Sequence, residues 1–442
     1  MNRKSKLFRG VFLASRWVRE RLSVGGLLVV NLTAFAAVFG LDTRANLAHG
    51  LFSLGFGVLT VDLLACLWLR RHSRGWAAQL QAERMLPDFV TKGEAARYRI
   101  RLLNRGARVT PAVELSEQLR QPWPTAQALR FHRSPIGGNR FDQRVGYPAF
   151  LDMLRRLRAV DIDAIALPSL APGQTIVLEV PIVAQARGLA GFEQMQAILT
   201  GPLGLIRQRV ALPAPSQSLA VLPQRLPIAI PPASGHRLFQ PGGISLAQRV
   251  GDTEEFRSLR DYRPGDPLRS VHWRSFARTG KPMVREYQEE FFSRHALLLD
   301  TAASHPFAPA LETAVSLAAW LVTRPRDSDS LLDLMFVGER VHRLTMGRGL
   351  GETDTVLRVL AGVDATPPAS IDALLKTTLH HAGQISSLIA ILLCWDEARR
   401  NAMRQLRARR VPLTIVLIDA PPLSADDEAE FLGQVRRISS AS

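Results

Sequence analysis

Cysteine is almost absent from this chain: Cys66 and Cys394 are the two cysteines among 442 residues. Two cysteines are too few for the disulfide framework that supports small secreted folds. Cys66 lies inside one apolar run, and Cys394 lies at the end of another. The sequence therefore predicts two buried, unreactive thiols.

The chain also lacks the short motifs that mark several enzyme classes. It contains no Gly-x-Ser-x-Gly nucleophile elbow and no His-Glu-x-x-His metal pair. The segment around Gly280 and Lys281 is not a Walker A loop, because Pro282 follows where Ser or Thr is required. We therefore expect a protein without catalytic activity of its own.

Patterns of nucleic-acid binding are missing as well, although the net charge is +17. The chain shows no interleaving of aromatic and basic residues and no zinc or basic-zipper signature. Residues 1–84 carry a net +8 of this excess, beside two apolar runs. Basic residues next to a membrane span attract anionic lipid. We therefore expect these basic residues to contact a lipid membrane, and we expect no nucleic-acid partner.

The two apolar runs near the amino terminus predict a membrane anchor. Residues 24–40 are apolar except for two polar side chains, and residues 50–69 contain one charge, Asp62. A helix needs about 20 such residues to cross the bilayer core. Residues 1–84 are therefore expected to form a basic leader and two transmembrane helices.

The basic residues indicate the orientation of this anchor. They cluster in residues 3–21 and 70–74, whereas the loop between the runs contains a single arginine. Lysine and arginine favour the cytoplasmic side, so both termini should be cytoplasmic in a multi-pass protein of the inner or plasma membrane. Asp62 is expected to face Asn31 or Thr33 across the helical pair, or a second protomer in a homo-oligomer.

Residues 85–230 predict an antiparallel β-sandwich. In an early strand of this region, Tyr98, Ile100 and Leu102 alternate with arginines, which is the period of a half-buried strand. Similar short apolar runs follow, separated by Pro and Gly. Residues 131–160 interrupt the pattern with a Gly- and Asn-rich start and a basic helical end. We interpret them as a surface excursion and assign them no function.

Residues 292–442 alternate short Leu/Ile/Val runs with amphipathic helical segments. Continuous apolar strands between helices predict a mostly parallel sheet covered on both faces. One strand pair is expected to turn at Gly338-Glu339. Ligands of such sheets bind beyond the carboxyl ends of the strands. Asp300 and Asp396 each follow a predicted strand and are therefore candidates for chemistry.

The most distinctive residues lie in the predicted linker 231–291. They are Arg260, Tyr262, Gly265, Asp266, Arg269, Trp273 and Arg278. Pro264 and Gly265 have the composition of a type II turn. Asp266 then suits the N-cap of a helix over residues 267–279, which begins with proline, and an extended segment is expected after it.

Two interpretations of these residues stay open. In the first, Arg260, Arg269 and Arg278 form a basic face for an acidic partner, and Trp273 is its apolar anchor. In the second, Asp266 accepts one or two of the guanidinium groups and clamps the sandwich onto the α/β domain.

The spacing R-x-Y-x-x-G-D-x-x-R-x-x-x-W-x-x-x-A-R, which starts at Arg260, resembles the signature of the domain-of-unknown-function family 58. Weaker similarity extends over residues 85–420. The resemblance implies a von Willebrand A-like domain at the carboxyl end. It also implies a MoxR-type AAA+ ATPase as the partner, since proteins with this signature typically accompany such ATPases.

The resemblance further implies a degenerate divalent-cation site. The segment DTAAS resembles the Asp-x-Ser-x-Ser motif of von Willebrand A domains, but Ala302 stands in place of the first serine. The implied ligands of a cation such as Mg²⁺ are Asp300, Ser304, Thr353 and Asp396. Because water must replace the lost hydroxyl, we expect a weak or absent metal site and otherwise no cofactor.

Together these features predict a multidomain protein that acts as a membrane-anchored cytoplasmic adaptor or scaffold for such an ATPase. The expected domains are a membrane anchor (1–84), a β-sandwich (85–230), a signature linker (231–291) and a von Willebrand A-like α/β domain (292–442). Two alternatives stay open. One is a hydrolase that uses Asp266 and His272, and the other is a cell-envelope scaffold that self-associates through the membrane hairpin.

Overall fold

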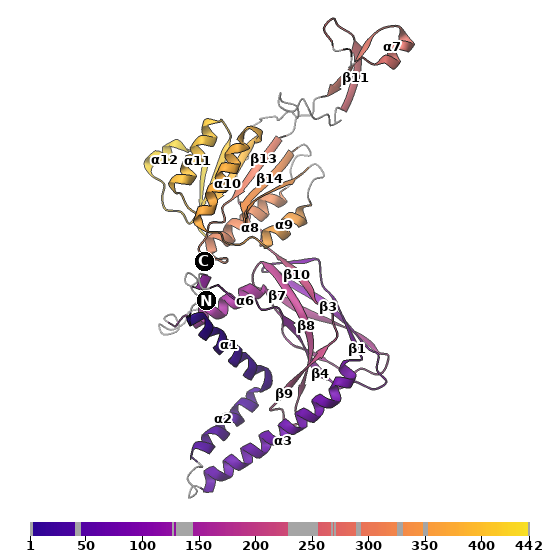
Figure 1. Cartoon of the computed structure of the whole chain (residues 1–442), viewed down its shortest axis with the longest axis vertical. Coiled ribbons are helices and arrows are strands. Elements are labelled where there is room, and N and C mark those ends of the chain that lie inside the picture. The colour runs from indigo at the N-terminus through magenta and orange to yellow at the C-terminus, as the bar shows by residue number, and fades with distance from the viewer. Residues whose placement is uncertain are drawn as a thin grey trace. The chain divides into compact units, whose positions relative to one another are not determined.

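The computed structural model describes most of the chain, in two compact units (Figure 1). The described residues are 3–39, 46–125, 128–129, 145–228, 255–266, 268, 271–288, 293–324, 330–347 and 352–440. Unit 1 comprises Met1–Arg225, Ser304–Ala308 and Leu357–Asp364. Unit 2 comprises Leu226–Ala303, Pro309–Val356 and Ala365–Ser442.

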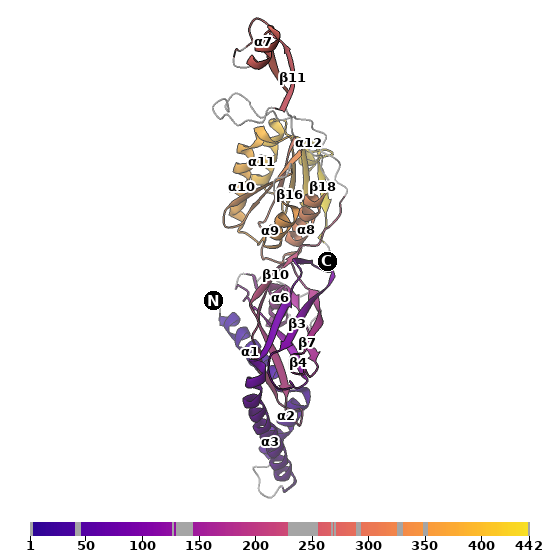
Figure 2. The same ribbon diagram turned by 90° about the vertical axis from the view of Figure 1, so that its right-hand side faces the viewer.

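Three helices open unit 1: α1 (Arg3–Arg21), α2 (Val24–Phe39) and α3 (Asn46–Ala77). By length and composition, α3 is the one described helix that is long and apolar enough to cross a membrane. α2 is apolar but shorter, so the predicted pair of transmembrane helices is not confirmed. In Figures 1 and 2, α2 and α3 lie side by side, and α3 continues toward the strands of unit 1.

Two sheets form most of the rest of unit 1. One has the order β1–β3–β7–β5, and the other has the order β2–β10–β8–β4–β6 with β9 paired to β8. The strands are β1 (Leu80–Met85), β2 (Phe89–Thr91), β3 (Ala95–Asn104), β4 (Val113–Leu119), β5 (Val160–Asp161), β6 (Ile165–Leu167), β7 (Thr175–Ala184), β8 (Gly188–Thr200), β9 (Arg207–Leu212) and β10 (Gln217–Leu222). Among these strands, β2 and β10 pair in parallel and the other pairs are antiparallel. The prediction of antiparallel sheet is confirmed.

Strand β3 illustrates why these residues form sheet. Tyr98, Ile100 and Leu102 are buried, whereas the arginines between them are exposed. Successive side chains of a strand point to opposite faces, so this alternation gives the strand one apolar face. The ring of Tyr98 packs edge-on against Phe192 of β8, with ring centroids 5.7 Å apart. Residues of both sheets therefore share one hydrophobic core.

Strand β10 lies inside the larger sheet between β2 and β8. Leu219 and Val221 are buried on one face of it, and the first proline, Pro223, comes after the last residue of the strand. A proline there removes no hydrogen bond from the ladder.

Helix α6 (Tyr147–Arg158) corrects the interpretation of residues 131–160 as a surface excursion. The helix buries three apolar side chains, including Phe150. The ring of Phe150 also contacts Phe8 and Phe12 of α1, with centroids 5.7 and 6.3 Å away. The aromatic contacts hold α1 against α6, which the local sequence pattern does not reveal. The Gly- and Asn-rich start of the segment lies outside the described residues.

Unit 2 contains a six-stranded sheet of order β15–β14–β13–β16–β17–β18. Its strands are β13 (Ser293–Leu299), β14 (Ser330–Val337), β15 (Val341–Met346), β16 (Ser387–Leu392), β17 (Leu413–Ile418) and β18 (Val435–Ile438). β14 and β15 form the antiparallel pair predicted at Gly338-Glu339, and the other neighbours are parallel. The sheet is therefore mixed and mostly parallel.

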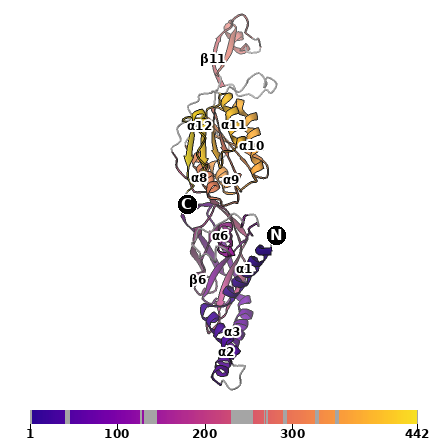
Figure 3. The same ribbon diagram turned by 90° about the vertical axis from the view of Figure 1, so that its left-hand side faces the viewer.

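Helices cover both faces of this sheet (Figure 3). Those that contact its strands include α8 (Pro309–Thr323), α10 (Ile371–His380) and α11 (Glu397–Ala408). Helix α12 (Ala425–Glu430) lies between β17 and β18 in the chain, and α9 (Thr353–Ala361) passes from unit 2 into unit 1 at Leu357. α10 and α11 share one hydrophobic cluster with inward residues of β13, β16 and β17. α8 contacts the same strands but contributes no residue to that cluster, so it covers the opposite face.

Candidate functional site

The first candidate site lies where strands β13 and β16 end. Asp300 directly follows β13, and its side chain is 0% exposed. Its Oδ1 accepts a hydrogen bond from the backbone N–H of Ala302 at 2.9 Å, and its Oδ2 accepts one from Leu393 at 3.1 Å. The carboxylate is thus fixed to the ends of two neighbouring strands. As expected for a parallel sheet, an acidic side chain stands at the carboxyl edge.

The cation beside Asp300 is an arginine of α11. Arg399 Nε donates to Asp300 Oδ2 at 2.8 Å, and Nη2 lies 2.7 Å from the same oxygen. The Arg399 side chain is 1% exposed. Burial is the largest single influence and opposes the positive charge, but the interactions with Asp300, Cys394 and Asp396 together outweigh it and raise the pKa of Arg399. The site therefore holds a permanently charged guanidinium that the chain itself supplies.

Asp396 holds the other side of the same guanidinium. Its Oδ1 accepts the backbone N–H of Arg399 at 2.9 Å, which makes Asp396 the N-cap of α11. Its Oδ2 forms an ion pair with Arg399 Nη1. Arg399 therefore connects the two carboxylates, Asp300 and Asp396, that the sequence had marked as metal ligands.

The remaining implied ligands do not complete a metal site. Ser304 and Thr353 have exposed side chains, and within the described residues neither is hydrogen-bonded to Asp300 or Asp396. The described part of the chain also contains no group of three or more His, Cys, Asp or Glu that could hold a metal ion. A Mg²⁺ ion requires near-octahedral oxygen ligands, and here a guanidinium binds both carboxylates. The residues present do not fit a divalent cation.

Sequence reasoning missed Arg399, although a signal for it exists. The buried residues of α11 are Arg399, Ala402, Met403 and Leu406. Their spacing follows the helical period, so Arg399 lies on the apolar face that packs against the sheet. A charged residue on an apolar face requires a buried partner, and Asp300 provides it.

Cys394 lies next to this cluster and is unreactive. Its Sγ is 3.8 Å from Asp396 Oδ2, and burial raises the pKa of the thiol to about 11. At neutral pH the thiol therefore stays protonated, and the thiolate is the nucleophilic form. Cys66 is buried as predicted, whereas Cys394 is half-buried.

The second candidate site is the hairpin formed by β11 (Glu255–Asp261), α7 (Trp273–Thr279) and β12 (Met283–Gln288), which we call the signature hairpin. Its turn matches the prediction: the Arg263 carbonyl accepts the Asp266 N–H at 3.0 Å, and Gly265 has φ +106°. A positive φ at this position favours glycine. The strand β11 was not predicted, and it pairs antiparallel with the predicted extended segment.

Asp266 braces this hairpin from inside. Arg260 Nη1 and Nη2 each donate to one Asp266 oxygen at 2.7 Å, and the Arg263 N–H donates at 2.8 Å. The hydrogen bonds from Arg260 and then from Arg263 lower the pKa of Asp266 to about 2. These partners belong to the hairpin itself. The contacts therefore stabilise the hairpin locally.

The helix of the hairpin starts later than predicted, which corrects the role of Asp266. α7 begins at Trp273 with His272 at its N-cap position, so Asp266 does not cap it. Val271 is buried and forms a β-bridge with Val284 of β12. β-branched residues favour such pairing over helix. Arg269, another signature residue, lies outside the described residues.

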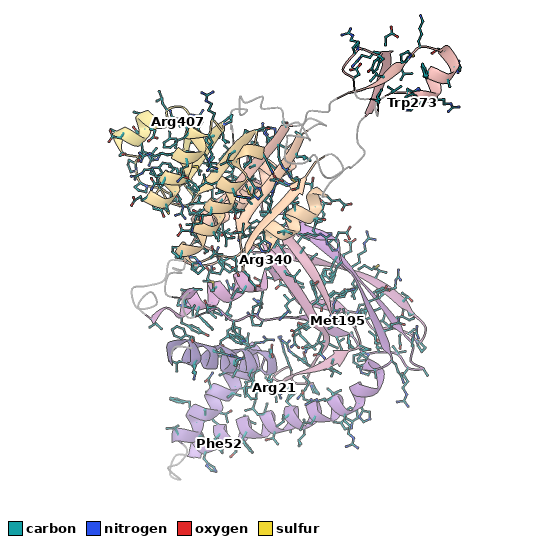
Figure 4. The ribbon with its side chains drawn as sticks, turned by 45° about the horizontal axis from the view of Figure 1, so that its top comes forward. Arg21, Phe52, Met195, Trp273, Arg340 and Arg407 are labelled. Atoms are coloured by element: carbon teal, nitrogen blue, oxygen red, sulfur yellow. The ribbon has the colours of Figure 1, made fainter. Side chains whose placement is uncertain are left out.

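The signature hairpin exposes aromatic rings. Trp273, labelled in Figure 4, is 59% exposed. Its ring meets that of Phe276 edge-on, with ring centroids 6.1 Å apart. Leu268 is exposed as well, whereas Tyr262 is half-buried. The exposed basic residues of the hairpin are Arg263, Arg274, Arg278 and Lys281. The arrangement combines apolar anchors with positive charge on one short element.

A histidine–serine pair also occurs in the hairpin. His272 Nδ1 lies 2.7 Å from Ser275 Oγ, a contact that sequence reasoning did not recognise. The same 2.7 Å contact joins His295 and Ser387, which are neighbours across strands β13 and β16. Because the second pair is a cross-strand contact of the sheet, such a pair alone does not identify a catalytic site. Asp266 is bound to Arg260 and is not hydrogen-bonded to His272 within the described residues.

Comparison with known proteins gives one family match and several low-scoring structural matches. Native alpha-2-macroglobulin of Escherichia coli is 18% identical over 37% of this chain and 9% of its own, with a TM-score of 0.17. The elastase-activated form is 13% identical over 76% of this chain and 27% of its own, with a TM-score of 0.20. PapD-like domain 7 of human CEP192 is 12% identical over 33% of this chain and 86% of its own, with a TM-score of 0.18.

TM-scores this low carry no argument about fold or function. The chain spans 9% and 27% of the two macroglobulin chains it matches. No curated protein matches the chain. The family model described as "Protein of unknown function DUF58" matches residues 258–420, which include most of the signature hairpin and the Asp300–Arg399 site. This match supports assigning that part of the chain to the DUF58 family.

Proposed function

We propose that this protein is a membrane-anchored cytoplasmic adaptor that binds a MoxR-type AAA+ ATPase through the signature hairpin and has no catalytic activity of its own. The observation that carries the proposal is the exposed pair of Trp273 and Phe276. Large aromatic side chains are rarely left exposed next to one another without a partner, and they dominate the affinity of protein interfaces.

The charge of the hairpin indicates the kind of partner. Arg274, Arg278 and Lys281 are exposed near the aromatic rings in sequence and on the same element. A basic rim around an apolar anchor favours a partner whose own surface is acidic, because complementary charge speeds association and excludes wrong partners. We therefore propose an acidic docking surface on the ATPase.

The two acidic clusters argue for binding over catalysis. A carboxylate such as Asp266, with a pKa of about 2, is a poor proton acceptor near neutral pH. Asp300 and Asp396 are both bound to Arg399, so neither is free to activate water or hold a substrate-bound cation. In this proposal the Asp300–Arg399 pair stabilises the fold, whereas the Asp266–Arg260 pair supports the hairpin that binds the partner.

The finer architecture belongs to the same proposal. We assign α2 and α3 as two transmembrane helices with both chain termini in the cytoplasm of a cell with an inner or plasma membrane. We assign the two sheets of unit 1 as a β-sandwich and the mixed sheet of unit 2 as a von Willebrand A-like domain. The apolar helices, the shared core between the sheets and the alternation of strands and helices support these assignments.

Affinity capture tests the proposal. The full chain in lipid nanodiscs serves as bait for membrane-associated proteins of the source cell, in Mg²⁺ and ATP. We expect capture of an AAA+ ATPase by the wild type and by Leu432→Ala, which truncates another exposed apolar residue of unit 2. We expect the Trp273→Ala variant to capture no AAA+ ATPase. Equal capture by both variants would overturn docking through the hairpin, and capture of nothing but further copies of this chain would favour a self-associating scaffold.

The His272–Ser275 contact favours one second candidate, a hydrolase. A serine within hydrogen-bond reach of a histidine has the geometry of an activated nucleophile. Ester hydrolysis that disappears in Ser275→Ala, with an unchanged melting temperature, would support this candidate. Hydrolysis that is absent from the wild type, or that Ser275→Ala leaves intact, would remove it.

A further inference from the structure

We propose that the loop between β8 and β9, residues Gly201–Ile206, enters the lipid bilayer beside α2 and α3, and that Asp62 holds it there. The part of the bilayer that it contacts is the acyl-chain region, inside the headgroup boundary. The inference rests on the membrane anchor of the proposed function and adds a third membrane-contacting element to it. We call residues 201–206 the β8–β9 loop.

Asp62 has a specific set of partners in this loop. The carboxylate is fully buried although it belongs to the apolar helix α3. Its Oδ1 accepts the backbone N–H of Leu203 at 3.0 Å, and its Oδ2 accepts those of Leu205 at 3.2 Å and Ile206 at 2.8 Å. We expected Asn31, Thr33 or a second protomer as the partner of Asp62, and the structure shows a loop of the same chain instead. Three backbone donors can satisfy a charge that would otherwise be costly inside an apolar helix.

The loop is also attached to the start of α2. The Ser23 N–H donates to the Leu205 carbonyl at 2.9 Å, and Leu22 forms a β-bridge with Ile206. Gly26 lies directly under Leu205: a Cβ atom there would be 2.2 Å from the Leu205 carbonyl oxygen. Backbone contact of this kind requires glycine. The loop is therefore held between the two apolar helices.

Close packing fixes the loop against α3 as well. Cys66 Sγ donates to the Ile206 carbonyl at 3.3 Å. A Cβ atom on Gly201 would lie 2.4 Å from an Asp62 carboxylate oxygen and 2.8 Å from Cys66 Sγ. Both ends of the loop thus approach one face of α3, within one turn of the helix.

The length of α3 gives the depth of the loop. From Leu47 to Trp68 the helix rises about 32 Å at 1.5 Å per residue, which matches a bilayer core of about 30 Å. Trp68 is exposed and is followed by Arg70 and Arg71, the usual sequence of an aromatic and basic membrane boundary. Asp62 lies six residues before Trp68, or about 9 Å toward the bilayer centre. The residues bound to Asp62 lie at the same depth.

Much of the exposed surface around the loop is apolar, and basic residues stand at its edge: Arg21 is exposed next to Leu22, and Arg207 follows Ile206. Leu203, at the tip of the loop, is 50% exposed. The neighbouring helices expose apolar side chains as well, among them Val24, Leu28 and Leu32 on α2 and Leu51, Leu54 and Leu64 on α3. The leucine of the loop continues this surface, so lipid that covers the helices also covers the loop. A loop can lie at this depth only if its backbone groups are bound, and the Asp62 contacts meet that requirement for Leu203, Leu205 and Ile206.

Fluorescence quenching by lipid tests the inference. The full chain with Cys394→Ser receives an NBD label at Leu203→Cys and is reconstituted into phosphatidylcholine–phosphatidylglycerol vesicles with nitroxide-labelled acyl chains. Cys66 stays, because it is buried. Two labelled variants serve as controls: Leu54→Cys on α3, and Val177→Cys on an exposed strand position of unit 1.

We expect the NBD fluorescence to be quenched several-fold more strongly at positions 203 and 54 than at position 177. Quenching at 54 without quenching at 203 would overturn the inference and leave the membrane anchor in place. Absence of quenching at both positions would overturn the anchor as well. Asp62→Ala should lower quenching at 203 while quenching at 54 persists. If Asp62→Ala leaves quenching at 203 unchanged, Asp62 does not hold the loop.

Discussion

Two aspartate–arginine pairs in unit 2 have similar geometry and very different surroundings. In the Asp300–Arg399 pair, the side chains are 0% and 1% exposed. In the Asp266–Arg260 pair, they are 15% and 36% exposed. Both pairs contain N–O distances of 2.7 Å. The N–O distance therefore does not distinguish the two pairs, whereas the exposure of their side chains to solvent does.

The difference in exposure separates a structural role from a binding role. A buried ion pair is difficult to break, because removal of one partner leaves an unpaired charge in a low-dielectric interior. The partly exposed Asp266–Arg260 pair is screened more strongly by water and salt, so it contributes less to stability. This pair instead holds the turn of a hairpin whose aromatic side chains face solvent. The following predictions test this contrast.

The largest effect is expected from Arg399→Ala. The substitution leaves Asp300 buried and uncompensated, and we expect a loss of about 3–5 kcal/mol of unfolding free energy. Arg400→Ala is the matched control, since the neighbouring Arg400 is partly exposed and Asp427 retains Arg404 without it. Its loss should stay within about 1 kcal/mol. Thermal unfolding followed by circular dichroism measures both, and equal losses would contradict the contrast.

Trp273→Ala should act on binding instead of stability. We expect the Kd for the captured ATPase to rise by at least about tenfold, as for truncation of a central aromatic anchor. The free energy of unfolding should change by no more than about 0.5 kcal/mol, because the side chain is exposed. Isothermal titration calorimetry gives the first value and thermal unfolding the second. A large drop in stability with unchanged affinity would reverse the assigned role.

A smaller effect is expected from divalent cations. If Arg399 takes the position of a cation between two carboxylates, Mg²⁺ should not raise the melting temperature of the wild type. Arg399→Ala leaves Asp300 and Asp396 without that positive charge, so Mg²⁺ should raise its melting temperature as a ligand of the folded state. Differential scanning fluorimetry over a Mg²⁺ series, with EDTA as reference, makes the comparison. A Mg²⁺-dependent wild type would contradict the assignment of Arg399.

The smallest effect concerns pH and the signature hairpin. The pKa of Asp266 is lowered from 3.8 to about 2, so its contacts stabilise the hairpin above pH 3.8 and lose that effect as pH falls toward 2. Hydrogen exchange of peptides from residues 255–288 should show more protection in the wild type than in Asp266→Asn at pH 4. This difference should shrink as the pH falls to about 2, where the carboxylate is half protonated, and it should vanish well below that pH. A difference as large at pH 2 as at pH 4 would show that the carboxylate charge is not its cause.

The α/β region was the most predictable part of the fold. Strands β14 and β17 are continuous buried apolar runs, a pattern typical of parallel strands covered on both faces. Glycine and charge between β14 and β15 marked their hairpin correctly. The last helix and strand, α12 and β18, were missed because each is short and charged. The domain boundaries proposed from composition remain predictions.

Tertiary contacts decided the features that the sequence did not predict. α11 contains several arginines, and Arg399 is the buried one among them because it pairs with Asp300 at the end of β13. Val271 pairs with Val284, which delays the start of α7 that turn and capping rules placed earlier. Asp62 was recognised as costly in an apolar helix, but its partners lie about 140 residues away. Local pattern contains no information on such distant partners.

The most direct test of the central claim is the affinity of the captured ATPase for two variants of the full chain in nanodiscs. Trp273→Ala truncates the exposed anchor of the signature hairpin, and Asp396→Ala removes the exposed carboxylate at the edge of the sheet. The account predicts that Trp273→Ala weakens binding by at least about tenfold while Asp396→Ala binds like the wild type. Wild-type affinity of Trp273→Ala together with lost binding of Asp396→Ala would place the partner site at the sheet edge and contradict the account.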